Sequence, residues 1–174
     1  DFKEKTELTL ERLFTTIRSS IKQYEQLMEL EQKYEETYRQ MTTNQLTKLP
    51  NRIKLLEDFS NKSQQTLILI DIIGFSVIND SNGYDVGDFI LKELGGFLLS
   101  MYGDRFNVYH LNNDLFALAT TKEHLDNLVN VVERIKDDIS KLRMITNNFN
   151  KTIETTIGVA YQSEDDVIRK AELA

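Results

Sequence analysis

The chain has 174 residues, of which 40% are hydrophobic, and this size suits one globular domain with an accessory element. A net charge of −7 and a pI near 4.9 argue against nucleic acid as a partner, because phosphate binding requires a basic face. The chain has no cysteine, which excludes disulfides and thiolate metal sites and suits a reducing cytoplasm.

Residues 1–43 predict one long helix, because they contain no Gly or Pro and are densely charged. Apolar residues recur in alternating steps of four and three at Leu10, Phe14, Ile17, Ile21, Tyr24 and Met28. This stripe is typical of a coiled-coil seam, and it slips to a second stripe at Leu27, Leu30, Tyr34, Tyr38 and Met41. We therefore expect a parallel homodimer through this helix, since about 40 helical residues span about 60 Å and exceed one small domain. The alternative is a single amphipathic helix that lies on its own domain.

The remaining segments alternate between helix and strand. Pro50 ends the first helix and suits the first turn of a second one. The expected elements are a helix over 51–60, a strand over 67–72, a helix over 86–101, a hairpin of 105–111 and 114–120 around Asn112-Asn113, a helix over 122–142, a strand over 152–161 and a helix from about 164. This order predicts an α+β sandwich with a central, mainly antiparallel sheet flanked by helices and preceded by the long N-terminal helix.

Polar residues of the type that binds nucleotides follow the first strand. Asp71 leaves the strand end, Asn79 and Asp88 lie in the run DIIGFSVINDSNGYDVGD (71–88), and Asp114 lies at the expected hairpin. Two carboxylates that meet near a strand end can hold Mg²⁺ against the phosphates of a nucleotide. Taken singly, each residue also has an ordinary structural role, as a strand-end carboxylate, a turn former, a loop cap or a first-turn helix residue.

Four motifs in this order resemble those of the GGDEF family, the diguanylate cyclases. NQLTKLPNR (44–52) is similar to the motif D-x-L-T-G-L-P-N-R, and the run 71–88 to D-I-D-x-F-K-x-I-N-D-x-x-G-H-x-x-G-D. NNDLF (112–116) lies where the signature G-G-D/E-E-F would be, and TTIGVA (155–160) resembles S-I-G-V-A. The resemblance covers residues 44–174, so we expect a coiled-coil signalling helix over 1–43 and, over 44–174, a GGDEF domain whose C-terminal end would follow Ala174.

The resemblance implies a reaction and a set of binding residues. In active members two domains meet, each with one GTP, and each 3′-hydroxyl attacks the other α-phosphate to give cyclic di-GMP, which needs positioning and Mg²⁺. By this resemblance Asp71, Asp114 and the carbonyl of Ile72 bind the metal. Asn79 and Asp88 hydrogen-bond the guanine.

Several changes fall on the reacting centre of that family. Leu115 replaces the signature Glu, and Leu can neither bind a metal nor accept a proton. Ser76 replaces a phosphate-facing Lys, and Asn112 and Asn113 add bulk at the nucleotide where the family has Gly. Further departures are Ile73 for the second Asp of D-x-D, His110 for a usual Arg, and Gly103 and Phe106 for the R-x-x-D product-inhibition site.

We therefore expect a catalytically inactive GGDEF domain that acts as a dimerising regulatory module and retains GTP with Mg²⁺. It would link an upstream sensor to a downstream output domain such as an EAL phosphodiesterase, within a longer chain. No apolar run approaches about 18 residues, so we expect the cytoplasm, or the cytoplasmic part of a membrane-anchored protein. Two alternatives stay open, namely a weak diguanylate cyclase or nucleotide hydrolase, and a ligand-free protein-interaction domain.

Overall fold

The structure is a computed structural model that describes residues 2–60, 65–121, 128–146 and 149–161. The chain divides into two compact units, residues 1–41 and 42–174, which are described separately here. No helix in the described ranges combines the length and the apolar content that a membrane crossing requires.

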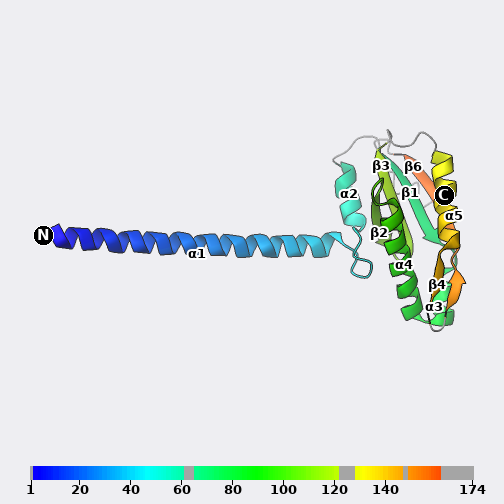
Figure 1. Ribbon diagram of the computed structural model, residues 1–174, viewed down its shortest axis with the longest axis horizontal. Coiled ribbons are helices and arrows are strands. Elements are labelled where there is room, and N and C mark those ends of the chain that lie inside the picture. The colour runs from blue at the N-terminus through cyan, green and yellow to red at the C-terminus, as the bar shows by residue number, and fades with distance from the viewer. Residues whose placement is uncertain (1, 61–64, 122–127, 147–148, 162–174) are drawn as a thin grey trace. The chain divides into compact units, whose positions relative to one another are not determined.

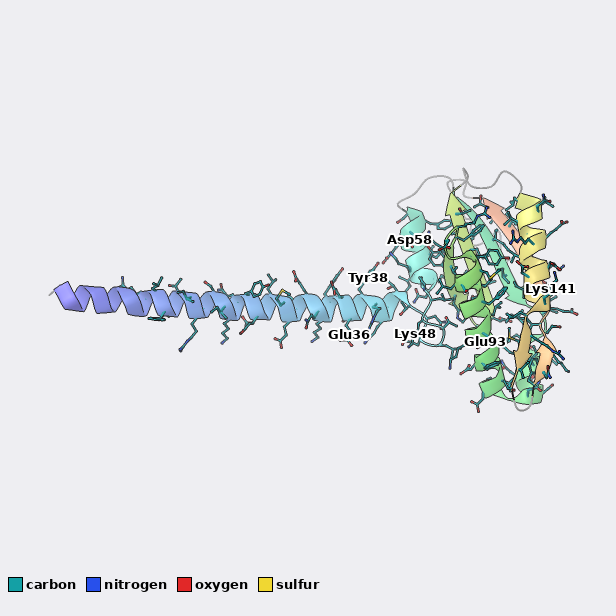
Figure 2. The ribbon with its side chains drawn as sticks, viewed as in Figure 1. Glu36, Tyr38, Lys48, Asp58, Glu93 and Lys141 are labelled. Carbon is teal, nitrogen blue, oxygen red and sulfur yellow. The ribbon has the colours of Figure 1, made fainter. Side chains whose placement is uncertain are left out.

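The first unit is the helix α1 (Phe2–Thr42), and it confirms the long helix predicted for this segment (Figure 1). The side chains drawn on this helix project from both sides of it in Figure 2. Within the single chain the apolar stripe is exposed, with Phe14 69% and Ile21 53% accessible to solvent. Tyr34 and Tyr38, one turn apart on the second stripe, stack with ring centroids 6.4 Å apart. The helix therefore presents long apolar side chains that the described chain itself does not bury.

The second unit is built on a four-stranded sheet. Its strands are β1 (Gln65–Ile72), β2 (Asn107–Asn112), β3 (Leu115–Thr121) and β6 (Thr155–Tyr161). They lie in the order β2-β3-β1-β6, and every neighbouring pair is antiparallel. This arrangement confirms the predicted antiparallel sheet.

Helices cover both faces of this sheet (Figure 1). Ile68 and Ile70 of β1 pack in a cluster with residues of α4 (Tyr84–Tyr102) and α5 (Leu128–Lys141). Leu67 and Leu69 pack in a second cluster with residues of α2 (Arg52–Ser60). Successive strand residues point to opposite faces, so the continuous apolar run of β1 supplies both clusters. The predicted α+β sandwich is confirmed.

Three elements differ from the sequence-based expectations. A short helix, α3 (Phe75–Asn82), was not predicted. Its Ser, Asn and Asp residues have low helix propensity, and Gly74 and Gly83 bound it with φ of 69° and 88°. The strand expected over 152–161 is divided into β6 and β5 (Asn150–Thr152), which pairs with β4 (Arg143–Ile145). These strands are too short to show a period. The start of the helix expected over 122–142 and the helix expected from 164 lie outside the described residues.

The segment between α1 and α2 forms a closed loop, which we name the 42–51 loop. The amide of Asn51 donates to the carbonyl of Thr42 at 2.8 Å, and the amide of Asn44 donates to the carbonyl of Leu49 at 2.8 Å. The carbonyl of Pro50 accepts from the amide of His110, on strand β2, at 2.9 Å. The loop is therefore fastened to the edge strand of the sheet.

Candidate functional site

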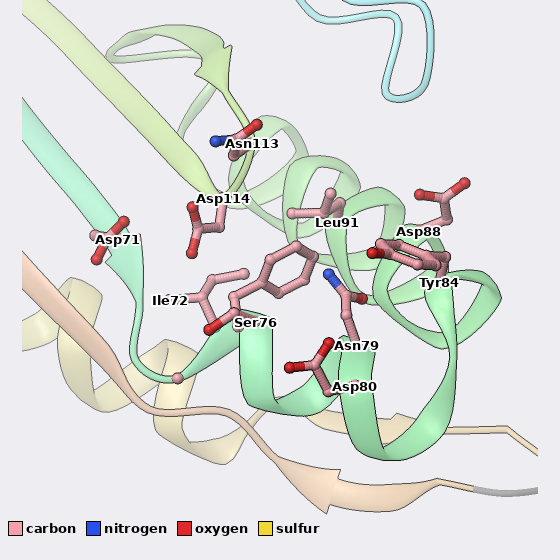
Figure 3. A pocket seen from close by; sticks show the side chains of 12 residues that line it. Asp71, Ile72, Ser76, Asn79, Asp80, Tyr84, Asp88, Leu91, Asn113 and Asp114 are labelled. Carbon is pink, nitrogen blue, oxygen red and sulfur yellow. The ribbon is translucent and has the colours of Figure 1, made fainter.

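A cavity of about 590 Å³ opens where β1 ends. Four segments line it, namely the end of β1, helix α3, the first two turns of α4 and the turn between β2 and β3 (Figure 3). Its volume lies within the range of about 300–1,000 Å³ that small-molecule sites occupy. The cavity is therefore large enough for a nucleotide.

The cavity brings together residues that are far apart in the sequence. Six of the seven predicted nucleotide and metal residues line it, namely Asp71, Ile72, Asn79, Asp88, Asn113 and Asp114. Asn112 is not among the lining residues. It remains in strand β2, paired with Leu115, and its side chain is exposed, whereas the turn begins at Asn113 with a φ of 42°. Ser76, at the position of the family's Lys, also lines the cavity.

Two carboxylates, those of Asp71 and Asp114, lie at one end of the cavity (Figure 3). Partial burial, and then the charge of Asp114, raise the pKa of Asp71 above its ordinary value of 3.8. A divalent cation between them would remove this repulsion. In the described part of the chain no group of three or more His, Cys, Asp or Glu side chains is arranged to hold a metal. The site therefore offers two carboxylates, with the backbone of Ile72 beside them.

The N-terminus of α3 lines the cavity through Gly74, Phe75 and Ser76. Gly74 caps the helix with a φ of 69° and no side chain caps its amides, which leaves the first N–H groups available. Free amides at a helix N-terminus favour anions such as phosphate. No Lys or Arg lines the cavity within the described ranges. Backbone amides and a metal would therefore have to offset the charge of a bound triphosphate.

The other end of the cavity suits a purine base (Figure 3). Tyr84, Asp88 and Leu91 are spaced by four and three residues, so they share one face of α4. On α3 Asn79 faces the same space, and its buried Oδ1 has no hydrogen-bond partner among the described residues. A buried polar atom without a partner costs free energy, so a donor from a ligand or a water is expected there. An aromatic ring, an apolar side chain and two hydrogen-bonding groups are a chemically suitable lining for guanine.

Sequence reasoning missed five lining residues, which are Gly74, Phe75, Asp80, Tyr84 and Leu91. Their signal is helical spacing, because Phe75 and Asn79 are four residues apart on α3. That spacing carries information only once α3 is known to be a helix.

Gly87 sets the position of Asn79. A Cβ at Gly87 would lie 1.9 Å from Asn79 Oδ1 and 3.1 Å from Phe75 Cζ, so the Asn79 amide would have to move. If a guanine base occupies the cavity, Gly87→Ala should weaken its binding by about tenfold or more, because the base loses one good hydrogen bond. Gly96→Ala is the control, since a Cβ there meets nothing within 4 Å. Titration calorimetry compares them, and equal dissociation constants for the two variants would contradict this role of Gly87.

Leu115 lies in register with Asp71 across the β1–β3 pair. Its side chain is half-buried and packs against the apolar cluster that includes Leu67 and Leu69. A carboxylate at this position would stand beside Asp71 on the same face of the sheet. Leu115 instead extends the apolar cluster up to the edge of the site.

His110 is buried beneath the turn that carries Asp114. It is 1% exposed and stacks on Phe116 with ring centroids 4.3 Å apart. Nε2 lies 2.8 Å from the carbonyl of Asn113, and Nδ1 lies 3.0 Å from Thr47 Oγ1. Burial lowers the pKa of His110 below 6.5 and outweighs the opposing effects of this hydrogen bond and the Asp114 charge. The imidazole is therefore neutral at pH 7.

Acidification is expected to destabilise the fold through His110. Its folded pKa lies below the unfolded value, so the unfolded chain binds more protons and stability falls as the pH drops through 6.5. In His110→Gln this dependence is absent, so the difference in unfolding free energy between wild type and variant should shrink on acidification. Urea unfolding of wild type and variant at about pH 7.5 and about pH 5.5 measures this difference in unfolding free energy. A difference that stays constant would show that His110 titrates normally.

Comparison with protein-family models identifies residues 41–174 with the model described as "Diguanylate cyclase, GGDEF domain". Because the match covers most of the chain, the chain belongs to the GGDEF family, the domain type of cyclic di-GMP signalling.

Solved GGDEF structures share this fold. The coiled coil and GGDEF domain of DgcB from Caulobacter crescentus, in complex with c-di-GMP, gives a TM-score of 0.72 at 20% identity, covering 86% of each chain. Diguanylate cyclase SiaD from Pseudomonas aeruginosa, in complex with its activator SiaC, gives a TM-score of 0.69 at 20% identity, and the match covers 99% of this chain and 74% of that one. The FimX GGDEF domain from the same organism gives a TM-score of 0.66 at 18% identity, and the match covers 76% of this chain and 90% of that one. At these identities the likeness shows the fold.

Curated relatives are longer proteins. An uncharacterized membrane protein of Staphylococcus haemolyticus is 28% identical over 117 residues, which are 67% of this chain and 33% of that protein. An uncharacterized membrane protein of Staphylococcus aureus is 27% identical over 117 residues, which are 64% of this chain and 33% of that protein. The chain thus spans about a third of the length of these relatives.

Proposed function

We propose that this chain is a catalytically inactive GGDEF domain that binds GTP with Mg²⁺ and acts as a dimerising regulatory module. One observation carries the proposal. The cavity keeps the carboxylate pair Asp71 and Asp114 at one end and Asn79 and Asp88 at the other, while Leu115 packs into an apolar cluster beside it. Groups suited to binding metal and guanine line the cavity, and the carboxylate that would complete the reacting centre is replaced by the hydrocarbon side chain of Leu115.

Catalysis requires more than this cavity offers. Phosphoryl transfer depends on positioned metal ions and cations that neutralise charge as it develops. Leu115 stands in register with Asp71 where a third carboxylate would bind metal or take a proton from the attacking hydroxyl. Ser76 supplies a hydroxyl where a Lys would supply a positive charge. These substitutions support binding without turnover.

The helix α1 supports the regulatory part of the proposal. Its exposed stripe, through Phe14, Ile17 and Ile21, would be buried in a parallel coiled coil with a second copy. In a longer protein the paired helices would carry a signal from an upstream sensor to the GGDEF pair and to a downstream output domain such as an EAL phosphodiesterase. The curated relatives are named membrane proteins, which supports placing this chain in the cytoplasmic part of a membrane-anchored protein.

A second candidate is a ligand-free protein-interaction domain. It is favoured by the charge of the cavity, which is lined by Asp71, Asp80, Asp88 and Asp114 and, among described residues, by no Lys or Arg. Without a metal this lining would repel a triphosphate. The two candidates therefore differ in whether a divalent cation makes nucleotide binding favourable.

Calorimetric titration with GTP, with and without Mg²⁺, separates these functions. The binding proposal expects a micromolar dissociation constant, about −8 kcal/mol, that requires the metal. ATP should bind more weakly, because adenine leaves the guanine-pairing groups of Asn79 and Asp88 without partners. Asp71→Ala should abolish the part of the GTP affinity that depends on Mg²⁺. If GTP at hundreds of micromolar gives no heat, the binding proposal fails and the ligand-free candidate stands. If the recovered sample contains cyclic di-GMP, the domain is a weak cyclase.

A further inference from the structure

His110 joins two segments through opposite sides of its ring. A carbonyl oxygen only accepts hydrogen bonds, so Nε2 must carry the proton that it donates to Asn113 O at 2.8 Å. In the neutral imidazole Nδ1 is then an acceptor, so the Thr47 hydroxyl, 3.0 Å away, donates to it rather than to Asn44 Oδ1 at 3.4 Å. These two hydrogen bonds connect Thr47 through the His110 ring to Asn113.

Thr47 belongs to the 42–51 loop, which follows α1 directly. Asn44 Oδ1 accepts from the amides of Leu46 at 2.9 Å and of Thr47 at 3.1 Å, which fixes the backbone around the hydroxyl. The loop also meets His110 through its backbone, because the His110 amide donates to the Pro50 carbonyl at 2.9 Å. A displacement of this loop therefore acts on His110 at two points.

The other end of the chain of contacts is the turn that carries a metal-binding candidate. Asn113 holds a φ of 42°, a conformation that L residues adopt rarely, and Asp114 follows it at once. The carbonyl of Asn113 accepts a hydrogen bond from His110, whose ring is buried and stacked on Phe116. A buried ring in a stacked position transmits displacement because it has little room to rotate. The orientation of the peptide before Asp114 is thus tied to the position of His110.

We propose that His110 is a positioning residue that couples the 42–51 loop to the Asn113–Asp114 turn, so that the loop controls the placement of the Asp114 carboxylate. The consequence for metal and nucleotide affinity rests on the proposed function. The coupling itself concerns the unliganded chain. A signal that reaches the end of α1 would arrive first at the loop and then, through Thr47 and His110, at the carboxylate pair.

The test compares Thr47→Val with Thr47→Ser in the full chain. Val keeps the shape of Thr but has no hydroxyl, whereas Ser keeps the hydroxyl. In the unliganded protein we expect Thr47→Val to shift the backbone amide resonances of Asn113 and Asp114, 66 and 67 residues away in the chain, and Thr47→Ser to leave them near wild type. Unchanged resonances in Thr47→Val, or equal shifts in both variants, would overturn the coupling.

A second readout follows binding. The dissociation constant for GTP with Mg²⁺ should rise about tenfold in Thr47→Val, equivalent to about 1.4 kcal/mol, and return to wild type in Thr47→Ser. A purely structural role of the hydroxyl would lower the melting temperature and leave this constant unchanged, which would contradict the positioning role. If the wild-type chain binds no GTP, the proposed function fails, and the amide resonances still decide the coupling.

Discussion

Incubation of this chain with GTP and Mg²⁺ or Mn²⁺ is expected to yield no cyclic di-GMP. Each lost group of this kind, a proton acceptor or a charge-stabilising donor, typically contributes about 10²–10³ in rate. Losing both the carboxylate at Leu115 and the cation at Ser76 lowers turnover by about four to six decades if the effects add. Mass spectrometry of the reaction mixture measures the product. Formation within about tenfold of ordinary enzyme turnover, about 1–10³ s⁻¹, would contradict the proposal.

Restoring one group should not restore activity. Leu115→Glu places a third carboxylate beside Asp71 and near Asp114, and this should tighten divalent metal binding. It supplies no cation for the phosphates, since Ser76 remains, and the Asn113 side chain still occupies the turn. The expected result is stronger metal binding with no product. Product from this single variant would show that Leu115 alone blocks the reaction.

Charges placed in the seam of α1 are expected to convert a dimer to a monomer. Ile17→Asp together with Ile21→Asp would bury uncompensated charges in the coiled coil, a strongly unfavourable change. Thr15→Asp with Ser19→Asp is the matched control, because these positions have the same spacing and the same added charge on the opposite face of the helix.

Light scattering at micromolar concentration measures the outcome. Wild type and control should have about twice the chain mass of 20.3 kDa, as dimers do. The seam variant should have the mass of a single chain. A wild-type chain of monomer mass would overturn dimerisation through α1.

The sheet was predictable because its strands carry strong local patterns. Continuous apolar runs such as 67–70 identify strands buried on both faces, and Asn113 indicated the hairpin turn before its φ of 42° was known. Helix α3 was not predictable by the same reasoning, because its sequence has low intrinsic helix propensity. Its formation depends on packing, since Phe75 and Ile78 bury against the main core and Gly87 allows α4 to approach closely. Tertiary contacts here override local preference.

The site was predictable in part. The residues carried over by family resemblance, such as Asp71 and Asp88, do line one cavity. Tyr84 and Leu91 could not be chosen from sequence, because their role depends on which face of α4 meets the cavity. Asn112 does not line the cavity, and β2 extends through Asn112, one residue beyond the strand that the sequence predicts.

Native mass spectrometry of the chain after incubation with GTP and Mg²⁺ tests the central claim most directly, because one spectrum reports assembly, occupancy and chemistry together. The proposal expects a dimer that carries two intact GTP molecules and releases no cyclic di-GMP. Asp71→Ala should give the same dimer without nucleotide. A spectrum of wild type with cyclic di-GMP, or with an empty chain at saturating GTP, would contradict the claim that this domain binds its nucleotide without turning it over.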